Sequence, residues 1–176
     1  MRDDLRPGNK FPDIELPNQD KEAVKLSSLM RGFPTVVLFS RGYYCPKDRR
    51  QLANYVEYLQ PELIVNYCKL VVVSVDSPVL SKEIRDGLGA TFPFLSDEEK
   101  RVITELDIVD SSDSIHSPVA IPYTFVLDRD RTIYKIYNGW WFVGRPTVEE
   151  LRMDYRALLS RRQDWWYDKT PPPYTE

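Results

Sequence analysis

The chain has 176 residues, of which 42% are hydrophobic and 29% are charged, and its formal net charge is -3. This length and composition are typical of one soluble globular domain, and the charge balance excludes a general basic surface for nucleic acid or membranes. No apolar run approaches the ~18 residues that span a bilayer. Because the charged N-terminus also lacks the apolar segment of a secretory signal, we expect a cytoplasmic location. Two cysteines and one histidine are too few for a disulfide scaffold or a structural zinc site, so we expect no metal.

The first half of the chain alternates between strand and helix signals. DIEL and AVKL, residues 13–16 and 23–26, alternate in polarity around a turn-forming PNQDK and predict an N-terminal hairpin. TVVLFS and KLVVVSVD, residues 35–40 and 69–76, are β-branched runs typical of strands buried on both faces. Between these strands a helix is expected to begin at Pro46, because proline is tolerated in the first helical turn.

Three later helices are predicted from their N-terminal capping patterns. Each pattern places a serine before proline, or a serine or threonine three residues before glutamate. The pairs are Ser77 with Pro78, Ser96 with Glu99 and Thr147 with Glu150, and they predict helices to about Gly87, over residues 98–108 and to about Arg162.

The remaining segments predict strands, a loop and a tail. FPFLSD, residues 92–97, is a short strand, and residues 110–122 form a polar loop. YTFVLD and TIYKIYNG, residues 123–128 and 132–139, are strands of a hairpin. The order hairpin–β–α–β–α–β–α–β–β–α predicts an α/β, thioredoxin-like fold. Its central mixed sheet is flanked by helices on both faces and carries an N-terminal hairpin extension. We expect one domain over residues 1–162 and a Trp/Pro-rich C-terminal tail over residues 163–176.

Cys45 is the candidate nucleophile. It follows a predicted buried strand and opens a helix, where unpaired backbone N–H groups and the helix dipole favour the thiolate. Arg41 and Arg49 add positive charge nearby, and Arg49 lies on the same helix face because it is four residues further on. Asp48 opposes this effect. The alternative is a buried and unreactive thiol, but the strand–Cys–Pro–helix sequence in this fold order favours a reactive one.

FSRGYYCPKDRRQL, residues 39–52, resembles the active-site segment of the peroxiredoxin-like alkyl hydroperoxide reductase/thiol-specific antioxidant family. The resemblance covers residues 6–160. It implies a thioredoxin-like fold and the reduction of hydroperoxides by a cysteine that passes through sulfenic acid. It also implies that Cys45 is this peroxidatic cysteine and that Pro122 is a cis-proline opposite it. Other segments agree with the family in the same order: PGNKFPDIELPN, LVVVSVDS, FPFLSD and IPYTFVLDRDRTIYKIYNGWW.

Four positions depart from the family pattern. Leu38 stands where many members have a proline, and Gly42 stands where they have a threonine that helps to hold the peroxide. Asp48 stands where the dithiol branch has a second cysteine, so Cys45 cannot form that local disulfide. Pro122 stands about where a second arginine precedes the late strand. The possible substitutes for this arginine are Arg41, Arg49 and Arg145.

Cys68 is the other thiol, and it is expected to be structural. It lies at the beginning of the predicted strand 69–76, whereas Cys45 follows the end of the strand 35–40. In a strand–helix–strand unit these two positions lie at opposite ends of the sheet, about 20 Å apart. Because a disulfide requires Cα atoms within about 7 Å, we expect a one-cysteine cycle in which an external thiol reduces the sulfenic acid.

Several residues around the cysteine have two interpretations. His116 is either a solvent-exposed loop residue or a titratable group near the cysteine. Trp140 and Trp141 either pack in the core or form a homodimer contact, and Arg145 is more often a surface residue at a helix start than an anion site. The candidate substrate-pocket residues are Gly42, Tyr43, Tyr44, Pro46 and Pro122.

The leading hypothesis is a thiol-dependent peroxidase of the peroxiredoxin type that acts through Cys45, with Arg41 or Arg49 stabilising the thiolate. Its partners would be a hydroperoxide and an external thiol or thioredoxin-like reductant, without nucleic acid or membrane. Such an enzyme would need no metal and no bound organic cofactor. A non-catalytic binding or assembly module on the same scaffold is the first alternative. A redox sensor, in which oxidation of Cys45 changes assembly, is the second.

Overall fold

The computed structural model describes residues 1–65, 67–140 and 143–161. The predicted tail over residues 163–176 and Trp141 lie outside this description, and the domain boundary at residue 162 stays a prediction. Within the described ranges, no helix combines the length and the apolar character that crossing a membrane requires.

A five-stranded mixed sheet forms the centre of the fold, with strand order β5-β4-β3-β8-β9. The strands β3, β4 and β5 are parallel neighbours, whereas β8 is antiparallel to both β3 and β9. This confirms the predicted parallel centre and the late hairpin. The strand bounds are β3 Thr35–Phe39, β4 Lys69–Ser74, β5 Phe94–Ser96, β8 Tyr123–Leu127 and β9 Ile133–Asn138.

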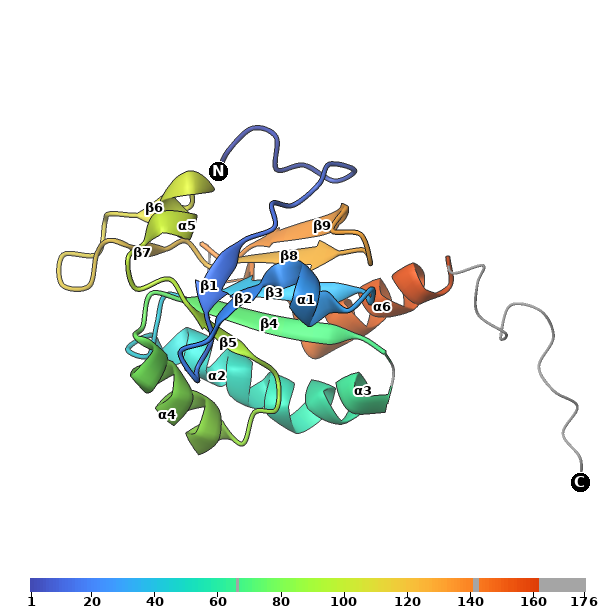
Figure 1. The fold of residues 1–176 in the computed structure, drawn as a ribbon, viewed down its shortest axis with the longest axis horizontal. Helices are drawn as coiled ribbons and strands as arrows, with labels where there is room; N and C mark the ends of the chain where they lie inside the picture. The colour runs from blue at the N-terminus through green and yellow to red at the C-terminus, as the bar shows by residue number, and fades with distance from the viewer. Residues whose placement is uncertain (66, 141–142, 162–176) are drawn as a thin grey trace, which may run out of the picture.

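Helices cover one face of the sheet, and they lie below it in the view of Figure 1. Alternate residues of β3, among them Val36 and Leu38, point toward this face and pack against Leu52, Tyr55 and other apolar side chains of the helices. The helix after Cys45 continues through a π-helical segment. The elements are α2 Pro46–Asn54, η1 Tyr55–Leu59, α3 Gln60–Val65, α4 Pro78–Leu88 and α6 Val148–Leu159.

The opposite face is covered by short elements and the N-terminal segment (Figure 1). Val37 and Phe39 of β3 point to this side, where Phe11 packs against both Phe39 and Phe125. The predicted N-terminal hairpin is confirmed as an antiparallel pair. The elements are β1 Glu15–Pro17, β2 Ala23–Lys25, α1 Leu26–Met30 and α5 Arg101–Glu105.

Two of the three predicted caps are confirmed. The Ser77 hydroxyl accepts a hydrogen bond from the Leu80 N–H, and Thr147 and Glu150 form a reciprocal capping box. The box predicted for Ser96 and Glu99 is wrong, because Ser96 belongs to β5 and its hydroxyl donates to the Asp76 carbonyl.

The Asp97 carboxylate replaces the predicted box at α5. It accepts hydrogen bonds from the backbone N–H groups of Val102 and Ile103. A carboxylate in this place satisfies donors that the first helical turn leaves unpaired. The helix therefore begins later than the pattern predicted, at Arg101.

The polar segment 110–122 is more ordered than the predicted loop. Its ends form a two-stranded sheet, β6 Val109–Asp110 with β7 Val119–Ala120. The prediction of a cis-proline at Pro122 is wrong: the cis peptide bond in this segment joins Ser117 to Pro118. The sequence permits either isomer before any proline, because the two differ by only about 1 kcal/mol.

Candidate active site

Cys45 lies between the central strand β3 and helix α2, as the sequence predicted. It is the N-cap residue of α2, and its extended backbone ends the loop that leaves β3. Its N–H donates to the Gly42 carbonyl at 3.1 Å, and its own carbonyl accepts the first helical hydrogen bond, from Arg49, at 3.1 Å. The residue is only 5% exposed. The N-terminal end of a helix, with its unpaired N–H groups, is therefore next to a largely buried sulfur.

The loop before Cys45 requires glycine at position 42. Gly42 has φ +116°, and a Cβ added there would lie 3.0 Å from Oδ1 of Asp76. The same carboxylate accepts the Tyr43 N–H, with Oδ2 at 3.0 Å. Burial raises the pKa of Asp76, against the lowering effect of this hydrogen bond. The absence of a threonine at position 42 therefore has a steric cause in this chain, because a β-branched residue at positive φ is strained.

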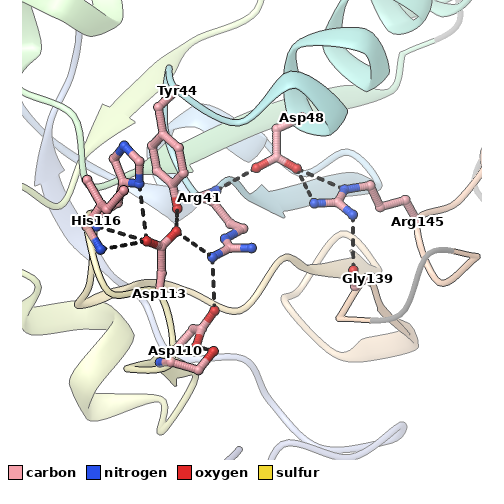
Figure 2. A network of polar contacts seen from close by, with 10 residues as sticks. Arg41, Tyr44, Asp48, Asp110, Asp113, His116, Gly139 and Arg145 are labelled. Carbon is pink, nitrogen blue, oxygen red and sulfur yellow. Dashed lines mark hydrogen bonds and ion pairs between the residues drawn. The ribbon is translucent and has the colours of Figure 1, made fainter.

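Asp48, in the first turn of α2, is the hub of one polar network. Its Oδ2 accepts the backbone N–H of Arg41 at 2.7 Å and the hydroxyl of Ser40 at 3.3 Å. Its Oδ1 accepts Nε and Nη2 of Arg145 at 2.8 and 2.5 Å. The third guanidinium nitrogen, Nη1, donates to the Gly139 carbonyl at 3.1 Å (Figure 2). The network therefore ties the cysteine loop to the loop after β9.

This ion pair corrects the sequence interpretation of Arg145 and gives Asp48 a partner that the sequence did not predict. The side chains of Asp48 and Arg145 are only 2% and 13% exposed, so Arg145 is not a surface residue. The negative charge of Asp48, which was expected to oppose a Cys45 thiolate, is paired with a guanidinium at hydrogen-bond distance. Both guanidinium nitrogens donate to the same oxygen, Oδ1, and such charge-assisted hydrogen bonds are stronger than bonds between neutral groups.

Arg41 forms the second network, on the other side of the cysteine loop. Its Nη2 lies 3.1 Å from Oδ2 of Asp110 and 3.1 Å from Oδ2 of Asp113. Its Nε is buried and has no hydrogen-bond partner among the described residues. Burial lowers the pKa of Arg41, but the charges of Tyr44, Asp110 and Cys45 outweigh it and hold that pKa above its ordinary value. Arg41 therefore lies within electrostatic range of the Cys45 sulfur.

Asp113 joins this network to two aromatic rings. Its Oδ2 accepts the Tyr44 hydroxyl at 3.2 Å, and its Oδ1 accepts the backbone N–H groups of Ile115 and His116 at 3.0 Å each. The His116 and Tyr44 rings stack with centroids 3.6 Å apart (Figure 2). These backbone hydrogen bonds hold the pKa of Asp113 well below its ordinary value, and burial raises that of Tyr44 to about 12. His116 is thus an exposed loop residue, in agreement with the first of its two interpretations, and its ring packs on Tyr44 of the cysteine loop.

The other predicted site residues lie at the margin of the two networks. Arg49 and Tyr43 are exposed, and the Arg49 guanidinium carbon lies 5.3 Å from the centroid of the Tyr43 ring. Pro46 is the first residue of α2, and the Pro122 carbonyl accepts the Gly139 N–H at 2.9 Å. The roles of these residues in a substrate pocket stay predictions. Trp140 is 43% exposed, so the core interpretation is wrong for this tryptophan, and the homodimer contact stays a prediction.

Cys68 lies at the opposite end of the sheet from Cys45. The neighbouring Lys69 pairs with Thr35 at the beginning of β3, whereas Cys45 follows Phe39 at its end. The four steps of this register alone span ~13 Å, beyond the reach of a disulfide. Burial raises the pKa of the Cys68 thiol to about 12. This geometry supports the structural interpretation of Cys68.

Sequence reasoning missed Asp110 and Asp113. Both lie in a segment whose composition indicated only a polar loop, and the pairing of β6 with β7 brings them to Arg41. The one signal in the sequence was the spacing of two aspartates beside the lone histidine, in the segment that leads to the late hairpin. That spacing alone does not identify a partner.

The order and pairing of these strands and helices define a thioredoxin-like fold, with Cys45 at the N-cap of the helix that follows the central strand. Residues 7–136 match the model of the AhpC/TSA family, and the chain belongs to this family. A Mycobacterium tuberculosis protein that is classed by name as a peroxiredoxin is 30% identical over 131 residues, which are 73% of this chain and 82% of that protein. The chain is accordingly a thiol peroxidase of the peroxiredoxin type.

Solved structures agree with this fold. Peroxidoxin BcpB of Mycobacterium tuberculosis is similar with a TM-score of 0.74 and 21% identity, over 90% of this chain and 99% of that one. A yeast mitochondrial 1-Cys peroxiredoxin is similar with a TM-score of 0.72 and 20% identity, over 97% and 83% of the two chains. At these identities, the likeness establishes the thioredoxin-like architecture of the chain.

Proposed function

We propose that the protein reduces hydroperoxides through Cys45 alone and that an external thiol regenerates it. The observation that carries this proposal is the separation of the two cysteines at opposite ends of β3 and β4. Asp48, which stands at the second-cysteine position of the dithiol branch, is engaged with Arg145 and carries no thiol. Neither Cys68 nor Asp48 is therefore suited to resolve an oxidised Cys45 within the chain.

The proposed first step is an attack of the Cys45 thiolate on the terminal oxygen of the hydroperoxide. The S–O bond forms as the O–O bond breaks, and the leaving alkoxide takes a proton to become an alcohol. Cys45 is oxidised to sulfenic acid, and the hydroperoxide is reduced. The α2 N-terminus stabilises the thiolate, and Arg41 is the arginine best placed to stabilise the leaving oxygen.

The second step consumes an external thiol. Its sulfur attacks the sulfenic sulfur, water leaves, and a mixed disulfide forms; a second thiol then displaces Cys45 and leaves with the first as a disulfide. The similar yeast 1-Cys peroxiredoxin is described as resolving its thiol through glutathione and thioredoxin systems. For this chain we propose a reductant of the same kind, either a small thiol or a thioredoxin-like protein, and a homodimer as its possible assembly.

A cysteine exchange tests the single-thiol cycle. Cys68→Ser is expected to retain turnover of an organic hydroperoxide with dithiothreitol within about twofold, because this thiol is remote and its pKa is raised by burial. Steady-state rates of the two reduced proteins provide the measurement, with Cys45→Ser as the inactive reference. A Cys68→Ser protein that is folded but oxidises once and does not turn over would contradict the proposal, because Cys68 would then be the resolving thiol.

A further inference from the structure

The two carboxylates that hold Arg41 contact a single guanidinium nitrogen, and the Tyr44 ring also lies against the guanidinium, with its centroid 5.9 Å from Cζ. Both carboxylate contacts, to Asp110 and Asp113, are made by Nη2 at 3.1 Å, and the dashed lines in Figure 2 converge on that nitrogen. The guanidinium is planar and carries its five N–H donors in a fixed fork. Fixing Nη2 between two oxygens therefore also fixes the direction of the edge that carries Nε.

That edge has a donor without an acceptor. Nε of Arg41 is buried and has no hydrogen-bond partner among the described residues. Leaving a buried donor unpaired is costly, so such a group needs an explanation, for example a catalytic role or a bound water or ion. The arginine is four residues before Cys45, and its backbone N–H is held by Asp48 at 2.7 Å. Main chain and side chain are thus fixed from two directions.

Asp110 and Asp113, which hold Arg41, belong to a segment that is distant from it in sequence. Asp110 is the last residue of β6, and its side chain is 2% exposed; Asp113 is held in place by the N–H groups of Ile115 and His116. The Tyr44 hydroxyl, next to Cys45 in sequence, donates to the same Oδ2 of Asp113. The segment 110–116 therefore holds two side chains of the cysteine loop through one carboxylate.

We propose that Asp110 and Asp113 are positioning residues that orient Arg41 so that its Nε edge donates to the oxygen of the bound hydroperoxide. This inference rests on the proposed function, and it identifies the loop between β6 and β7 as part of the peroxide-reducing site. Arg41 supplies positive charge from the cysteine loop itself, and the two aspartates determine its direction. A donor aimed at the leaving oxygen stabilises the negative charge that develops there as the O–O bond breaks.

Two reactions of the same thiol distinguish this role from a merely structural one. Iodoacetamide is neutral and alkylates the Cys45 thiolate without a guanidinium donor, whereas the hydroperoxide requires one. Asp113→Asn keeps the size of the side chain and an oxygen acceptor for the Ile115 and His116 N–H groups. We expect it to slow the oxidation of Cys45 by an organic hydroperoxide ~10- to 100-fold, by misplacing the donor, while alkylation across pH 5–9 changes less than about threefold.

Arg41→Ala provides the coupling test. Arg41→Ala alone is expected to slow oxidation at least as much as Asp113→Asn, and the double variant no more than Arg41→Ala, because both changes remove one contribution. Asp110→Asn is the second single variant, since it leaves the hydrogen bonds of residues 113–116 intact. Circular dichroism and a denaturation midpoint identify folded variants before the rates are compared.

The outcomes are separate for the two proposals. Oxidation at the wild-type rate in a folded Asp113→Asn or Asp110→Asn protein would overturn the positioning role, as would parallel changes in oxidation and alkylation. Additive losses of oxidation rate in the Arg41→Ala/Asp113→Asn double variant would also overturn the positioning role. A wild-type protein whose Cys45 does not react with hydroperoxide would instead overturn the proposed function. Alkylation of Cys45 in that protein would show that the thiol is accessible and that the failure lies in its reaction with hydroperoxide.

Discussion

Arg145→Ala is expected to lower the free energy of unfolding by about 3–5 kcal/mol, because it leaves the carboxylate of Asp48 buried without its partner. The Asp48 side chain is 2% exposed, and Arg145 supplies both guanidinium contacts to its Oδ1. The remaining partners of Asp48, the Arg41 N–H and the Ser40 hydroxyl, bond to the other oxygen. Chemical denaturation of the two proteins at neutral pH measures the difference.

Arg49→Ala is the matched control, since it removes an exposed arginine from the same region. It is expected to change the stability by less than about 0.5 kcal/mol. The double variant Asp48→Ala/Arg145→Ala should lose less stability than the sum of the two single variants, because removing both partners leaves no buried charge. If Arg145→Ala and Arg49→Ala lower the free energy of unfolding equally, the ion pair between Asp48 and Arg145 does not stabilise the cysteine loop.

Gly42→Thr is expected to destabilise the protein and not to increase its peroxidase rate. Gly42 has φ +116°, where a β-branched residue is strained by about 1–3 kcal/mol. The added Cβ would also lie 3.0 Å from Oδ1 of Asp76, the carboxylate that holds the Tyr43 N–H. Relief of this contact would displace the loop that carries Cys45. The substitution therefore introduces the family's hydroxyl and disturbs the geometry on which it depends.

Gly32→Thr separates the two causes. Gly32 also has positive φ, but a Cβ there meets nothing within 4 Å, so only conformational strain remains. Urea denaturation and hydroperoxide consumption of both variants are the measurements. A Gly42→Thr protein that is as stable as wild type and faster with hydroperoxide would show that the glycine is not a steric requirement of this loop.

The elements that local pattern determines were predicted well. The runs 35–40 and 69–76 contain the buried strands β3 and β4, Cys45 is at the N-terminus of helix α2, and Thr147 with Glu150 forms the capping box of α6. In each case the signal lies within a few neighbouring residues. The helix-capping box at Ser96 was wrong because tertiary structure overrides such a signal. Ser96 is a strand residue, and Asp97 is the cap.

The parts of the site that depend on distant pairing were not predictable from one sequence. Arg145 lies 97 residues after Asp48, and Asp113 lies 72 residues after Arg41. No periodicity links such positions, and the pairing of β6 with β7 was hidden in a polar segment. The sequence could identify the nucleophile and a set of arginines, but only the fold assigns each arginine its carboxylate.

The most direct test of the account is the intact mass of the fully reduced protein after brief exposure to one equivalent of hydroperoxide, with Cys45→Ser as the control. The account predicts rapid addition of one oxygen atom at Cys45, absent from the control and reversed by a small thiol. No change in mass would contradict a peroxidatic Cys45. Loss of two hydrogens would instead show a disulfide with Cys68 and contradict the separation of the two thiols across the sheet.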